Sequence, residues 1–100
     1  MIRPAFDRLD SIVAPEFRRH VIELATEKNS TVVIDLINVK FMDSSGLGSV
    51  ISCYKATQKS GGVSLCNINE DVKEVFILTH MDRIFSIHDD YDSCLKKQAA

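Results

Sequence analysis

The chain carries at positions 31–36 the stretch Thr31-Val32-Val33-Ile34-Asp35-Leu36, which is the most informative segment for the fold. The stretch is short and rich in β-branched residues, and it is apolar on both of the faces to which side chains alternate along a strand. This pattern is typical of a strand that is buried on both faces of a parallel sheet. We therefore expect a parallel sheet with this strand at its centre.

One helix is expected before that strand along the sequence, and a second helix is expected after it. In residues 15–28 the apolar side chains recur at helical spacing, and Pro15 suits a first helical turn because its missing N–H would have no intrahelical partner. After residues 38–40, a second apolar stripe predicts another helix, which Gly61-Gly62 ends. The second stripe consists of Leu47, Val50, Ile51 and Tyr54.

The remaining elements continue the alternation of strands and helices. A short strand is expected at Val63–Cys66, and Asn69 is a good N-cap for a third helix. Ile84–Ile87 alternates as a last strand, and Tyr91–Lys97 could form a short closing helix. Alternating strands and helices predict an α/β fold with a mostly parallel central β-sheet and about four helices.

Composition limits the architecture and the classes of ligand. A chain of 100 residues with 45% hydrophobic residues suffices for one domain, residues 1–100, with one core. A net charge of −2 makes nucleic acid an unexpected partner. No apolar run has the ~18 residues of a membrane span and no signal peptide is recognisable, so a cytosolic location is expected. The scattered cysteines and histidines predict neither a disulfide, nor a metal site, nor a cofactor.

The segment Asp43-Ser44-Ser45-Gly46-Leu47-Gly48 places a carboxylate and two hydroxyls at the start of the second helix. The unpaired N–H groups and the positive dipole end of a first helical turn can hold an anion, so a phosphoserine would be tolerated there. The glycines at 46 and 48 would let another backbone approach. Asp and Ser are also favoured caps in any helix, and the residues alone leave both interpretations open.

The face of this helix opposite the apolar stripe is expected to be exposed and to accept a partner closely. Its residues are small, whereas solvated faces usually carry more long charged side chains. The face consists of Gly48, Ser49, Ser52 and Ala56.

Residues 41–48, followed by Tyr54-Lys55 and Gly61-Gly62, closely resemble the signature of bacterial anti-sigma-factor antagonists of the STAS superfamily. The resemblance extends from Leu9-Asp10 to residues 84–87. It implies a single STAS domain in which Ser44, directly after Asp43, is phosphorylated by a GHKL-type anti-sigma factor kinase and dephosphorylated by a PP2C-type phosphatase.

The resemblance also implies a function. Unmodified, the protein would bind the kinase through Asp10, Asp43, Ser45, Gly46, Gly48, Ser49 and Ser52, and phosphorylation of Ser44 would release it. The alternative is a STAS accessory subunit of a lipid-transport ABC ATPase. An enzyme is not expected, because no G-x-S-x-G motif surrounds the serine and the sequence puts no histidine near it.

The sequence departs from the family pattern in its first strand, at Arg8, where the family often has an acidic partner-facing residue, and at one turn. The family usually has one more strand and a glycine three residues before Asp10, where this chain has Asp7, so a shortened first strand is expected. His80 occupies a turn position that the family often gives to glycine. A left-handed backbone there would be strained for a histidine.

Overall fold

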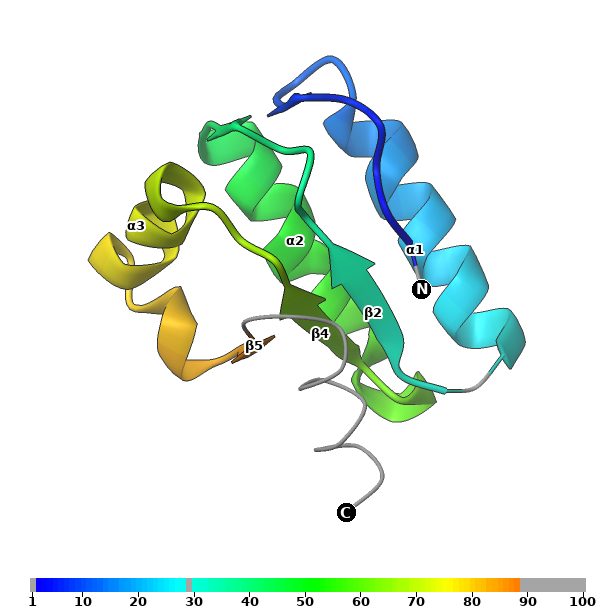
Figure 1. Cartoon of the computed structure of the whole chain (residues 1–100). Coiled ribbons are helices and arrows are strands. Elements are labelled where there is room, and N and C mark those ends of the chain that lie inside the picture. The colour runs from blue at the N-terminus through cyan, green and yellow to red at the C-terminus, as the bar shows by residue number, and fades with distance from the viewer. Residues whose placement is uncertain (1, 29, 89–100) are drawn as a thin grey trace.

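The computed structural model describes residues 2–28 and 30–88. Three α-helices and five strands are found in these residues, and the α/β fold class is confirmed (Figure 1). The expected closing helix at residues 91–97 lies outside the described residues. The elements are β1 (Arg8–Leu9), α1 (Ala14–Lys28), β2 (Val32–Asp35), β3 (Phe41–Met42), α2 (Ser44–Thr57), the 3-10 helix η1 (Gln58–Ser60), β4 (Val63–Cys66), α3 (Glu70–Leu78), the 3-10 helix η2 (Met81–Arg83) and β5 (Ser86–His88).

The described strands pair in parallel, as the sequence predicts, in two groups. The larger sheet has the order β2-β4-β5, and the smaller one pairs β1 with β3. The prediction that the strand at 31–36 is central is wrong, because β4 lies between β2 and β5. β2 is nevertheless buried at all four positions, and its other edge carries an isolated bridge between Ile2 and Ile34.

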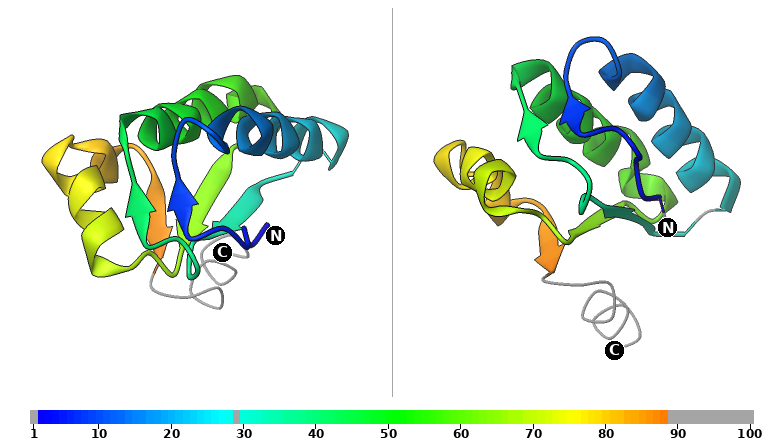
Figure 2. Two further views of the ribbon diagram at one scale, coloured as in Figure 1. Left: turned by 90° about the horizontal axis from the view of Figure 1, so that it is seen from above. Right: turned by 45° about the horizontal axis from the view of Figure 1, so that its top comes forward.

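α1 and α2 lie side by side over one face of the larger sheet, and α3 lies near β5 (Figure 2). The stripe that predicts α1 is buried at Phe17, Val21 and Ala25, and that of α2 at Leu47 and Val50. These side chains form one hydrophobic core with the inner residues of β2 and β4. Burial of this core is the main driving force for the fold.

The sequence predicts the start of α3 correctly but places the start of the last strand too early. Asn69 is the N-cap that the sequence predicts, since its side chain accepts a hydrogen bond from the N–H of Val72 at 3.2 Å. The last strand was expected at Ile84–Ile87 but begins at Ser86, because Ile84 ends the 3-10 turn η2. Phe85 is instead buried edge-on against the rings of Tyr54 and Phe76.

Backbone strain is found where the family pattern predicts it. His80 has φ 62° and ψ 16°, the left-handed conformation that follows the C-terminus of α3. The His80 N–H donates to the carbonyl of Ile77 at 3.1 Å, which satisfies an otherwise unpaired group of the last helical turn. Helix termination therefore requires a conformation that disfavours a non-glycine residue.

Candidate functional site

The pairing of β1 with β3 brings two aspartates together that are distant in sequence. Leu9 is opposite Met42 in the parallel register, so Asp10 and Asp43 follow at the same end of the two strands. Asp10 leads into α1 and Asp43 into α2. Asp10 and Asp43, which are both predicted to bind the partner, therefore lie at the same end of the β1–β3 pair.

Asp43 is the N-cap of α2. Its backbone is extended, with φ −99°, and its Oδ1 accepts a hydrogen bond from the Gly46 N–H at 2.9 Å. The Leu47 N–H donates to the Asp43 carbonyl at 2.9 Å. Within the described part of the chain, the N–H groups of Ser44 and Ser45 have no acceptor. These two donors and the positive helix dipole can stabilise an anion at this end of α2.

Ser44 and Ser45 are the first two residues of α2, and both are exposed. The first turn of the helix contains no acidic residue. Because both hydroxyls are exposed, another protein can contact them without any rearrangement of the backbone. Exposure is the first requirement for modification by a kinase, and both serines meet it.

Asp10 organises the loop that leads into α1. Its Oδ1 accepts a hydrogen bond from the Ile12 N–H at 3.0 Å, and its carbonyl accepts one from Ala14 at 2.9 Å. A side chain that bonds the backbone two residues later forms an Asx-turn, which fixes local loop geometry. Arg8 lies 3.8 Å from Asp10 Oδ2, and its guanidinium stacks over the Phe41 ring at 4.3 Å.

The two glycines of the segment have different surroundings. A Cβ on Gly46 would lie 2.1 Å from the carbonyl oxygen of Leu9, whereas a Cβ on Gly48 would meet nothing within 4 Å. The backbone that approaches Gly46 is therefore the chain's own β1. Only Gly48, which is exposed, leaves room for a backbone from another protein.

The prediction that the whole small-residue face of α2 is exposed is wrong at one position. Gly48 and Ala56 are exposed and Ser52 is half-buried, but Ser49 is only 7% exposed. The Ser49 hydroxyl donates to the Gly46 carbonyl at 2.7 Å. The physical reason is α1, which packs along this side of α2 and uses its small residues for close helix contact.

A groove of about 450 Å³ separates the N-terminal halves of α1 and α2 beside the serine pair. Four of the residues predicted to bind a partner line it, namely Ser45, Gly48, Ser49 and Ser52, whereas its residues from α1 and from the loop before α1 were not predicted. The α1 side is invisible in a sequence because those residues lie about 30 positions away. The groove is lined by Ser11, Ala14, Pro15, Arg18, Ser45, Gly48, Ser49 and Ser52.

Comparison with known proteins identifies the family. The STAS domain model matches residues 4–94. This chain belongs to the STAS domain family. An anti-sigma-B factor antagonist of Bacillus subtilis is 34% identical over 79% of this chain and 72% of its own length. An anti-sigma F factor antagonist of Paenibacillus polymyxa is 37% identical over 58% of this chain, which spans only half of that relative.

A solved structure is similar to the STAS domain described above. An anti-sigma-factor antagonist (STAS) domain protein from Planctomyces limnophilus superposes with a TM-score of 0.85 over 97% of this chain and 86% of the other. The two sequences are 24% identical, so this similarity concerns the fold. The parallel sheet and the helix arrangement are therefore those of a STAS domain.

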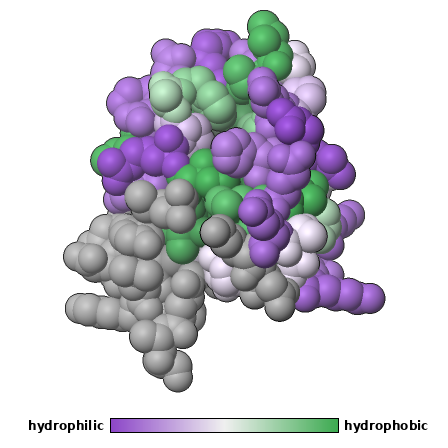
Figure 3. Space-filling model, turned by 90° about the vertical axis from the view of Figure 1, so that its right-hand side faces the viewer, coloured by the Kyte–Doolittle hydropathy of each residue, from purple (hydrophilic) through white to green (hydrophobic). Residues whose placement is uncertain are grey.

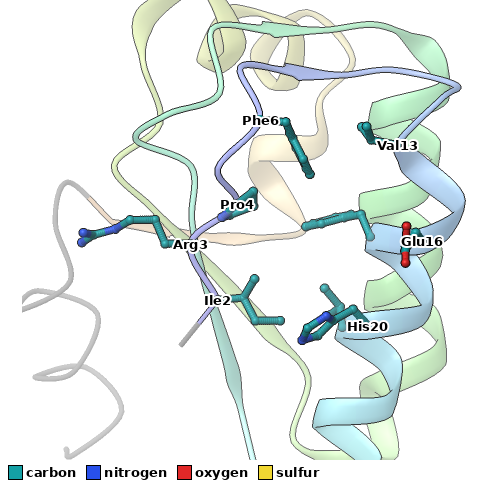
Figure 4. Close-up of a pocket in the computed structure, with 9 residues that line it drawn as sticks. Ile2, Arg3, Pro4, Phe6, Val13, Glu16 and His20 are labelled. Carbon is teal, nitrogen blue, oxygen red and sulfur yellow. The ribbon is translucent and has the colours of Figure 1, made fainter.

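A second cavity of this STAS domain, about 350 Å³, lies between the N-terminal segment and α1 (Figure 4). Ile2 and Phe6 extend from the segment toward α1, and His20 extends from α1 toward Ile2. Figure 3 looks onto the side of the molecule where α1 lies and shows hydrophobic surface between hydrophilic residues. The cavity shares no lining residue with the groove beside the serines.

Two other features of the described residues bear on chemistry. Burial raises the pKa of the Cys53 thiol from 9.0 to about 11, an effect that the nearby Arg18 charge offsets only in part. A neutral buried thiol is a poor nucleophile. Among residues 2–28 and 30–88, no cluster of side chains suited to a metal ion is found, and no helix is long and apolar enough to cross a membrane.

Proposed function

We propose that this STAS domain is an anti-sigma-factor antagonist regulated by phosphorylation. The protein acts in the cytosol. In its unmodified form it binds a GHKL-type anti-sigma factor that is also a serine kinase. Phosphorylation of Ser44 releases the kinase, and a PP2C-type phosphatase restores the binding form. The protein acts by binding and catalyses no reaction of its own.

One observation carries the proposal: Ser44 is exposed at the first position of α2, between a capping aspartate and a groove. Asp10 is held at the same end of the molecule by the β1–β3 register. The two relatives named as anti-sigma factor antagonists support the same role. The surface thus combines a modifiable hydroxyl with a site where another protein can approach.

The physical basis of release is the charge of the phosphate. Phosphorylation adds about −1.5 to −2 charges at neutral pH, and the helix dipole favours a negative charge at this terminus by about 0.3–1 kcal/mol. The folded domain can therefore accept the modification. In the complex the same charge meets a surface shaped for a hydroxyl, where a desolvated and unpaired charge costs several kcal/mol.

The test uses the GHKL-type serine kinases of the source genome, each purified and incubated with the protein and radiolabelled Mg-ATP. We expect one kinase to label the wild-type protein and Ser45→Ala, but not Ser44→Ala. Because both serines are exposed, the two variants are matched controls for each other. Label on Ser45, or full labelling of Ser44→Ala, would place the modification elsewhere.

Constitutive binding would favour the alternative function. If no kinase labels the protein but it binds the ATPase of a lipid transporter with equal affinity before and after Ser44→Ala, then Ser44 serves only as a helix residue. That result would assign the domain to a transporter as an accessory subunit.

A further inference from the structure

The groove between α1 and α2 contains a single ionisable side chain. Of its eight lining residues, only Arg18 is charged, and the others are small or carry hydroxyls. Arg18 is exposed, and its Nε donates to the Ser52 hydroxyl at 2.8 Å. That bond links α1 to α2 and holds the guanidinium at the groove.

Arg18 differs in its charge partners from its neighbour on the same helix. Arg19 lies 3.4 Å from Glu16 and 3.2 Å from Glu23, so two carboxylates compensate its charge. No ion pair within the described ranges involves Arg18. Within the described residues, the charge of Arg18 therefore has no carboxylate partner at the edge of the groove.

We propose that this groove receives an acidic side chain, Asp or Glu, of the protein partner, and that Arg18 is the residue that selects it. The inference rests on the proposed function and deepens it by naming the chemistry of the partner surface. A guanidinium presents a planar fork of donors that matches a carboxylate, and the bond to Ser52 occupies only Nε. The terminal nitrogens remain for the carboxylate.

The dimensions and charges of the groove favour this occupant over others. Ser11, Gly48 and Ser49 are small, so the groove has space for a short acidic side chain beside Arg18, and the hydroxyls of Ser11 and Ser45 can donate further hydrogen bonds. Asp10, which lies one residue before Ser11, has the opposite charge. A partner that presents an acidic side chain to Arg18 and a basic one to Asp10 can dock in only one orientation.

The experiment measures the affinity of the kinase that labels the wild-type protein for four variants, by calorimetry at 50 and 200 mM salt. Arg18→Gln keeps most of the side chain's length but removes its charge, and Arg18→Glu reverses the charge. Arg19→Gln and Arg19→Glu are the matched controls. We expect Arg18→Gln to weaken binding about tenfold and Arg18→Glu about a hundredfold, with both Arg19 variants within about twofold.

A second readout distinguishes a charge contact from a structural role. The affinity of the wild-type protein for the kinase should decrease when the salt concentration is raised from 50 to 200 mM. This decrease should be smaller for Arg18→Gln, because one ion pair is missing. All four variants should melt within a few degrees of the wild-type protein, since Arg18 and Arg19 are exposed. Unchanged affinity of Arg18→Glu would overturn the inference and leave the proposed function intact.

Other occupants of the groove give other results. If no kinase binds the wild-type protein, both the proposed function and this inference fail. If inorganic phosphate binds with the same dependence on Arg18 while kinase affinity is unaffected by the variants, the groove is a site for a free anion and the inference is overturned. If the wild-type protein forms a dimer that Arg18→Glu abolishes, again with unaffected kinase affinity, the groove binds a second copy of the chain and the inference is overturned.

Discussion

Neighbouring small side chains on α2 have opposite environments. Gly48 is exposed beside the serine pair, whereas Ser49 is buried against α1. A substitution at Gly48 therefore tests the binding surface without disturbing the core. A large residue at Ser49 would instead unpack α1 from α2, so its effect on binding would report on folding.

Gly48→Arg should weaken binding of the kinase at least tenfold, or about 1.4 kcal/mol, because the side chain would occupy the groove. The free energy of unfolding should stay the same or rise by up to about 1 kcal/mol, since arginine is the better helix former. Ala56→Arg is the control, because Ala56 is exposed on the same helix two turns further on. Calorimetry and urea unfolding measure both quantities. Equal loss of affinity in the two variants would mean that the binding surface is not confined to the start of α2.

Cys53 should be inert in the folded protein. A pKa near 11 leaves about a hundredfold less thiolate at pH 8 than a thiol with the ordinary value of 9.0. A variant that retains only Cys53, with Cys66→Ala and Cys94→Ala, should react with a thiol reagent at least a hundredfold more slowly when folded than in urea. Equal rates in the two conditions would contradict the burial of Cys53.

The same pKa shift predicts how stability depends on pH. Between pH 9 and 11 the unfolded chain loses the Cys53 proton while the folded chain keeps it, so stability falls as the pH rises through this range. This loss of stability between pH 9 and 11 should be absent in Cys53→Ala, which measurements of urea unfolding across that pH range would check.

The start of α2 is positioned by β1 rather than by local sequence. The Asp43 N–H donates to the Leu9 carbonyl at 3.4 Å, and the same carbonyl lies against Gly46. The helix terminus and the Asp10 loop are therefore parts of one contact. The spacing between Ser44 and Asp10 depends on the absence of a side chain at position 46.

Gly46→Ala should destabilise the protein by about 1–3 kcal/mol, because its Cβ would overlap the Leu9 backbone and push β1 away from α2. The melting temperature should fall by several degrees for a domain of this size. Gly48→Ala is the matched control in the same helix and should raise stability by about 0.5–1 kcal/mol. Thermal melting of both variants measures the difference. Two variants of equal stability would show that the chain can shift at Gly46 without cost.

At the scale of the whole domain, the proposed switch lies at the surface of a single packed core. Its parallel strands, the two helices over them and the β1–β3 pair are joined through one core. A charge added at the exposed start of α2 lies outside that core. Phosphorylation therefore need not create a second fold in order to abolish binding.

Phosphorylated protein should melt within about 5 °C of the unmodified protein, since the helix dipole offsets part of the repulsion from Asp43. Its affinity for the kinase should fall more than a hundredfold, which corresponds to a loss of about 3 kcal/mol. Ser44→Asp should reproduce the effect imperfectly, and Ser45→Asp less. Thermal melting and partner titration on the same sample decide the matter. A collapsed melting temperature would replace the electrostatic mechanism with one based on unfolding.

Local patterns in the chain were sufficient for the three helices and for the strands β2 and β4, but not for the short strand β3. Helical spacing predicts α1 and the apolar stripe of α2, and Asn69 predicts the start of α3, because these signals arise from residues three or four positions apart. The buried strand at 32–35 follows from its β-branched composition. The suitability of residues 43–45 for an anion also follows from local sequence, since a helix terminus always leaves N–H groups unpaired.

The tertiary structure decided which residues share a surface. The central position of β4 depends on its pairing with β2 and β5. The burial of Ser49 depends on α1, and the role of Gly46 depends on β1. No local pattern records such contacts. Arg18 and Arg19 are indistinguishable as adjacent basic residues of one helix. Only the packing of α1 on α2 gives Arg18 the groove and leaves Arg19 to its glutamates, because side chains one position apart point in directions about 100° apart around a helix.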